Sequence, residues 1–216
     1  IRAKVEGRQI MAHIAESIAA FLYRHEILER DMQEICAYGL ELLISTLIEV
    51  INVIFVSVLA HKIIFGIIYI ICIMTIRKYT GGYHADTKLR CNIIFIIIYI
   101  LSLISMQWIQ KINNYNLILW CGLIASYIYV IYNAPIENHN KPLNQCQINK
   151  NRKSSILIYG IFMMLGIIYD ISGMAIGIVK NLNCYSVYIK IILIFIVIAM
   201  IVGKYKERCF YRMAIM

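Results

Sequence analysis

Long apolar runs separated by short polar segments dominate the chain. Six of these runs approach the length of a membrane span, and they cover residues 42–60, 63–76, 91–109, 117–133, 155–179 and 185–203. A helix needs about 20 mostly apolar residues to cross a bilayer, and the runs lack the alternation of polar and apolar residues that marks a β-barrel strand. The pattern therefore predicts an all-α, polytopic integral membrane protein with about six transmembrane helices.

The second run, residues 63–76, is shorter than the others. As a helix it would rise only about 21 Å, whereas the hydrocarbon core of a bilayer is about 30 Å thick. It is either a short span or a re-entrant piece that the surrounding protein supports.

Residues 9–28 show a different, amphipathic pattern. A helix here would gather its apolar residues on one face, namely Ile10, Ile14, Ile18, Phe21 and Leu22, and would keep its polar residues elsewhere, namely His13, Glu16, Arg24 and His25. Such a helix either lies on the membrane surface or packs against a soluble neighbour. We expect no cleavable signal peptide, because residues 1–40 are mixed polar and charged.

These patterns divide the chain into three expected parts. Residues 1–40 form an N-terminal cytoplasmic or interfacial amphipathic segment, residues 41–203 a transmembrane domain, and residues 204–216 a basic cytoplasmic tail.

Composition and charge support this class. The chain of 216 residues is 61% hydrophobic and 15% charged, whereas soluble domains are about 45–50% apolar and about 25% charged. Its net charge of +9 points to membrane lipids as partners rather than to nucleic acid, because no nucleic-acid-binding motif accompanies it.

Basic residues gather on one side of the expected spans. Seventeen lie in the segments 1–41, 77–90, 134–154 and 204–216, and the other side has Lys62, Lys111, Lys180 and Lys190. Because basic loops stay in the cytoplasm, we expect both termini and the 77–90 and 134–154 connections there.

The seven cysteines do not form a recognisable framework. They are scattered, with no CxxC pair and no zinc-ligand spacing. We therefore expect free thiols rather than disulfides, and neither a metal nor a cofactor.

The segment "RKYTGGYHADTKLRC", residues 77–91, carries candidate chemistry. A cysteine attacks as its thiolate, and a histidine can take the proton and pass it to a leaving group. His84 and Cys91 are seven residues apart, about 10.5 Å of rise on one straight helix, so a working dyad requires a bend between them. Gly81 and Gly82 supply backbone freedom for it. The alternative is that the pair is structural.

A helix is expected to begin just before Cys91. Asp86 or Thr87 is a suitable N-cap. Cys91 would then lie near the N-terminal end of the third span, where the helix dipole and the nearby Lys88 and Arg90 favour a thiolate.

Three separated segments resemble one family. Arg77, Gly82, His84, Ala85 and Cys91 of the first motif, "APIENHNKPL" at residues 134–143 and "YGLELLISTL" at residues 38–47 are similar to segments of the accessory gene regulator B (AgrB) family of membrane cysteine peptidases. The resemblance implies a bacterial cell-membrane enzyme of quorum sensing that cleaves a short propeptide with an acidic C-terminal tail. It also implies that the enzyme cyclises the signal core to a thiolactone or lactone through an acyl-enzyme thioester.

Carried over residue by residue, the resemblance implies that Cys91 is the nucleophile and His84 the base and acid. Arg77 and Gly82 match family positions important for activity. Arg77 either holds a carboxylate of the propeptide tail or anchors the loop by its charge. Lys141 and its basic loop either bind the tail or only fix topology. The family also suggests a homodimer.

Other possibilities stay open at this point. A third catalytic residue is unassigned, because Asp86 suits a cap better and the acids in the spans, Glu41, Glu49 and Asp170, are either functional or paired for packing. A peptide exporter without catalysis, or a membrane scaffold for a sensor kinase, is the alternative function.

Overall fold

The computed structural model describes residues 2–27, 29–81, 88–136, 144–176 and 180–215. Within these ranges six helices are long and apolar enough to cross a membrane, and the only β pairing is an isolated bridge between Gly81 and Ile136. The prediction of an all-α, polytopic membrane protein is therefore confirmed.

The chain divides into two compact units, and the first consists of residues 1–59 and 85–97. It contains α1 (Arg2–Arg24), the short 3-10 helix η1 (Arg30–Met32), α2 (Gln33–Leu59) and the start of α4 (Lys88–Ile109). Helix α1 packs against α2.

The amphipathic pattern of α1 is only partly used by this packing. Ala15 and Ala19 are fully buried, whereas Ile14, Ile18 and Phe21 from the predicted apolar face are 46%, 39% and 58% exposed. The structure thus leaves the large apolar side chains uncovered, as a helix on a membrane surface requires.

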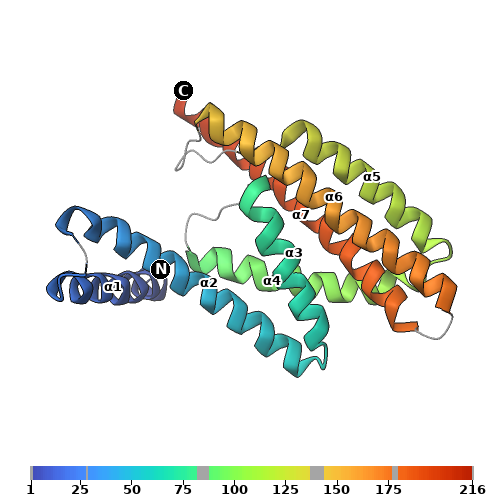
Figure 1. Cartoon of the computed structure of the whole chain (residues 1–216), viewed down its shortest axis with the longest axis horizontal. Helices are drawn as coiled ribbons and strands as arrows, with labels where there is room; N and C mark the ends of the chain where they lie inside the picture. The colour runs from blue at the N-terminus through green and yellow to red at the C-terminus, as the bar shows by residue number, and fades with distance from the viewer. Residues whose placement is uncertain (1, 28, 82–87, 137–143, 177–179, 216) are drawn as a thin grey trace. The chain divides into compact units, whose positions relative to one another are not determined.

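The second unit, residues 60–84 and 98–216, is a bundle around α7 (Lys180–Ile215). Helices α5 (Tyr115–Asn133) and α6 (Gln145–Ile176) run along α7, as Figure 1 shows, and α3 (Ile63–Thr80) packs against both α6 and α7. Residues 187–193 of α7 are all buried, so this helix forms the centre of the unit.

Buried tyrosines tie the bundle together, and their hydroxyls find partners. The Tyr188 hydroxyl lies 3.0 Å from that of Ser102, and the Tyr159 hydroxyl donates to the Leu193 carbonyl at 3.1 Å. The ring centroids of Tyr69 and Tyr99 are 5.0 Å apart, so these two rings pack against each other. A polar group left unpaired inside a bilayer would cost several kcal/mol, so these contacts let polar residues fill the core.

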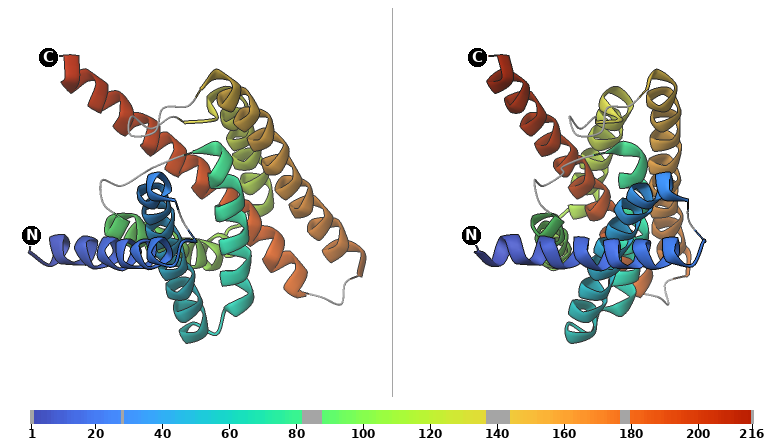
Figure 2. Two further views of the ribbon diagram at one scale, coloured as in Figure 1. Left: turned by 60° about the vertical axis from the view of Figure 1, so that its left-hand side comes forward. Right: turned by 90° about the vertical axis from the view of Figure 1, so that its left-hand side faces the viewer.

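The helices extend beyond the predicted apolar runs. Helix α2 begins at residue 33, ahead of the run at 42–60, α6 begins at residue 145 inside the predicted 134–154 connection, and α7 continues to residue 215 through the segment predicted as a basic tail. Figure 2 shows α7 as one long helix that ends near the C-terminus. The segments 145–154 and 204–215 contain no glycine or proline and include good helix formers, so a helix can continue through them.

The second apolar run is a continuous helix. Helix α3 has 18 residues, which corresponds to about 27 Å of rise. Its length favours a short span over a re-entrant piece.

Candidate active site

The five residues predicted for the site are not all visible. Arg77 and Cys91 belong to the described parts of the chain, whereas Gly82, His84 and Lys141 lie outside the described residues. The same holds for Asp86 and Thr87, the expected caps. The His84–Cys91 dyad therefore stays a prediction. The structure describes the residues that precede this segment in the chain, up to Gly81, and those that follow it, from Lys88.

Cys91 lies where the sequence predicted it, in the first turn of a transmembrane helix. Helix α4 begins at Lys88, and the Cys91 thiol is half-buried and free of any disulfide. All seven cysteines are described, and none of them forms a disulfide.

The residue after Cys91 anchors the start of α4 to α2. Asn92 is 5% exposed, and its side-chain oxygen accepts a hydrogen bond from the Ser45 hydroxyl at 3.3 Å. Ser45 is 6% exposed and belongs to the 38–47 segment. Sequence reasoning missed this pair, whose members are 47 residues apart, although two small polar residues inside apolar runs were a signal for it.

Arg77 lies in the last turn of α3, which ends at Gly81. The Gly81 N–H donates to the Arg77 carbonyl at 3.1 Å, and the Ile136 N–H donates to the Thr80 carbonyl at 2.9 Å. The backbones at Gly81 and Ile136 pair in parallel. The structure thus joins two of the three segments that carried the resemblance.

The end of α5, just before Ile136, is held by two neighbouring helices. From α6, the Arg152 guanidinium donates to the Ile131 carbonyl at 3.1 Å. From α7, the Lys204 ammonium donates to the side-chain oxygen of Asn133. Sequence reasoning placed Arg152 in a loop that either binds the propeptide tail or fixes topology, and Lys204 in the basic tail, and it did not predict these two contacts, because their acceptors are remote in the chain.

A second polar cluster lies inside the bundle. Lys190 is fully buried and forms an ion pair with Asp170; its ammonium also donates to Asn116 at 2.8 Å. Trp120 and Ser186 contact the same carboxylate, at 3.2 and 2.5 Å. Asp170 is therefore a paired residue, and Lys190, which was counted with the connections, lies inside α7.

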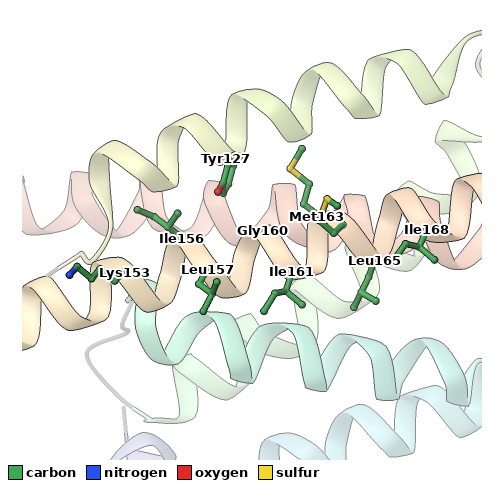
Figure 3. A pocket seen from close by; sticks show the side chains of 10 residues that line it. Tyr127, Lys153, Ile156, Leu157, Gly160, Ile161, Met163, Leu165 and Ile168 are labelled. Atoms are coloured by element: carbon green, nitrogen blue, oxygen red, sulfur yellow. The ribbon is translucent and has the colours of Figure 1, made fainter.

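An apolar hollow lies along α6. Its volume is about 810 Å³, and Figure 3 shows Lys153 at one end and Tyr127 on the neighbouring α5. The other lining residues are apolar, and Leu157, Ile161 and Ile168 are more than half exposed. A spanning helix presents such a face to lipid, and the lining contains no cysteine, histidine or acid, so this hollow is not the active site.

Among the residues that the structure describes, no group of three or more His, Cys, Asp or Glu side chains could hold a metal ion.

Six potential spans and a thiol outside any disulfide in the first turn of one of them define the class: a multi-pass α-helical membrane protein with a candidate thiol nucleophile. A family model described as "Accessory gene regulator B" matches residues 15–202. The chain belongs to this family.

Individual relatives agree. The chain is 30% identical to an AgrB-like protein of Clostridium perfringens (strain SM101 / Type A) over 146 residues, which are 65% of this chain and 68% of that protein. It is 22% identical over 167 residues to the accessory gene regulator protein B of Staphylococcus intermedius, covering 76% and 77% of the two chains. No solved structure matches the chain. Family membership gives the protein a role in the agr quorum-sensing system, in which the family acts on a propeptide.

Proposed function

We propose that the protein is a cysteine endopeptidase that cleaves a signal propeptide at the C-terminal side of its core and closes the core into a thiolactone or lactone ring. The observation that carries the proposal is the position of Cys91: a half-buried thiol, not part of a disulfide, in the first turn of α4, directly before the buried Asn92 that fixes this turn to Ser45.

The reaction has two acyl transfers. His84 takes the proton of the Cys91 thiol, and the thiolate attacks the scissile carbonyl. The C–N bond breaks, the proton passes from His84 to the leaving amine, and the core remains attached to Cys91 as a thioester. A thiol or hydroxyl of the core then gives its proton to His84 and attacks the thioester, which releases the ring and the Cys91 thiol.

Ring closure is favoured over hydrolysis by two physical effects. The attacking group belongs to the same peptide as the thioester, so its effective concentration is high. A site at the end of transmembrane helices also limits access of water to the acyl-enzyme.

The same proposal assigns partners and location. Lys141, and Arg77 at the end of α3, attract the acidic tail of the propeptide, and Gly82 supplies backbone freedom close to His84 in the sequence. The protein acts in the bacterial cell membrane, in contact with its lipids, with both termini in the cytoplasm and as a homodimer.

Replacing the two reacting residues tests the function. In membranes with a tagged propeptide, Cys91→Ser should abolish tail release, and His84→Ala should lower its rate by about 10²- to 10⁴-fold, the usual contribution of an acid–base group. Cys121→Ser, which replaces an exposed thiol in α5, is the matched control and should release the tail at the normal rate. Near-normal release by Cys91→Ser would favour an exporter or scaffold instead.

A further inference from the structure

We propose that the backbone bridge between Gly81 and Ile136 positions the active site, because it fixes in one place the starts of the two segments that carry His84 and Lys141. The inference rests on the proposed function. It concerns Gly81 and Ile136 as positioning residues that act through the backbone, and neither side chain takes part in the reaction.

The bridge requires glycine at position 81. Gly81 has φ +69° and ψ −151°, a combination that essentially only glycine adopts. A Cβ at this position would lie 2.4 Å from the Ile136 carbonyl oxygen and 3.2 Å from the Ile136 nitrogen. Both atoms are backbone, so the contact could not be relieved by a side-chain rotation.

The two sides of the bridge are themselves held firmly. Thr80 is fully buried, and its hydroxyl lies 3.1 Å from the carbonyl of Ile76, one turn earlier in α3. On the other side, Ala134 is 5% exposed, and the preceding turn of α5 is held by Arg152 and Lys204. Three helices of the bundle therefore fix the position of Ile136, and the bridge transfers this fixed position to Gly81.

The place of the bridge in the chain gives it a role beyond packing. Gly81 is three residues before His84, and Ile136 is five residues before Lys141. A chain segment that starts from a fixed point has fewer conformations to lose when its side chains take up a reactive geometry. A base must come within about 2.6–3.2 Å of the proton that it takes, and a displacement of about 1 Å can cost about 10²-fold in rate.

Gly81→Ala tests the proposal, with Gly160→Ala as the matched control. Gly160 is a helical residue of α6 in the same unit, and a Cβ there would be 3.5 Å from its nearest neighbour, the Tyr127 hydroxyl, an ordinary contact. We expect Gly81→Ala to lower the rate of tail release by about 10²-fold and Gly160→Ala to leave it within about twofold. Ile136→Ala, which keeps the backbone bond, should also stay close to normal.

A second readout separates positioning from loss of fold. In a protein whose only cysteine is Cys91, the rate of thiol alkylation is measured against pH for the parent, His84→Ala and Gly81→Ala. If the bridge positions His84, the profile of Gly81→Ala should move towards that of His84→Ala. If Gly81→Ala does not insert into the membrane, Ile136→Pro replaces it. Proline at position 136 removes the N–H that donates to the Thr80 carbonyl and adds no atom at Gly81, and its alkylation profile should move towards that of His84→Ala as well.

The outcomes distinguish this inference from the proposed function. If Cys91→Ser abolishes tail release but Gly81→Ala keeps the parent's rate and alkylation profile, the bridge has no positioning role. If Cys91→Ser itself retains release, the proposed function is wrong, and the positioning role is wrong with it.

Discussion

The two ends of helix α5 are held in different ways. At its start, Asn116 and Trp120 contact the ion pair of Asp170 and Lys190, whose ammonium is fully buried in the bundle. At its end, Ile136 pairs through its backbone with the end of α3. One end is thus joined to its neighbours by an ion pair buried in the bundle, and the other by separate charged donors from α6 and α7 and by a backbone bridge just beyond the helix.

The difference shows what each end can tolerate. A charged pair inside a membrane is sensitive to the loss of either member, because the remaining charge has no counterion, but the pair can be replaced as a unit. A backbone bridge tolerates most side-chain changes and is sensitive to one added Cβ. The first arrangement joins helices to one another, and the second fixes the points from which two connecting segments start.

The two ends of α5 are expected to lie on opposite sides of the membrane. Helix α5 has 19 residues, about 28 Å of rise, and the basic residues predict that its end faces the cytoplasm. In a cysteine-free protein, Asn113→Cys should react with an impermeant maleimide in intact cells, and Asn144→Cys only after permeabilisation. Both positions are exposed. The reverse result would contradict the proposed orientation.

The ion pair gives the largest expected change in stability. Lys190→Met leaves the Asp170 charge without its counterion and should lower the free energy of unfolding by about 3–5 kcal/mol. The double replacement Lys190→Met with Asp170→Leu should recover most of this loss, because an apolar pair needs no counterion. Unfolding in detergent measures both. An unchanged stability in the single variant would show that the pair contributes nothing to the bundle.

A smaller loss is expected at the other end of α5. Lys204→Met removes the charged donor to Asn133 and should cost about 1.5 kcal/mol, the lower range for a hydrogen bond to a charged group. Lys150→Met, which changes an exposed lysine of α6, is the control and should change the free energy of unfolding by less than about 0.5 kcal/mol. If both variants unfold alike, Lys204 does not hold the end of α5.

The spans could be predicted from the sequence because lipid offers no hydrogen-bond partners to the backbone. A long apolar run therefore forms a helix, which satisfies its own backbone groups. The same logic placed Cys91 in the first turn of α4. It gave no prediction of the helical turns at residues 145–154 and 204–215, because apolar length does not set the ends of a helix outside the apolar run, and local propensity decides there.

The contacts around the site could not be predicted for a different reason. The sequence indicated that Gly81 supplies backbone freedom, but the close approach that requires it comes from Ile136, 55 residues later. The pairs Ser45–Asn92 and Asp170–Lys190 likewise join separate helices. Which residues of two apolar helices face each other depends on how the helices rotate and cross, and spacing within one helix does not contain this information.

The length of α7 has a practical consequence. Its 36 residues rise about 54 Å, and a hydrocarbon core takes up about 30 Å of this. The remaining length is shared by the two ends of the helix, and on the C-terminal side residues 204–215 correspond to about 18 Å, or roughly three turns, beyond the apolar run. A reporter domain fused after residue 215 would be carried away from the lipid surface without an added linker, which makes this terminus suitable for a bulky fiducial in electron microscopy.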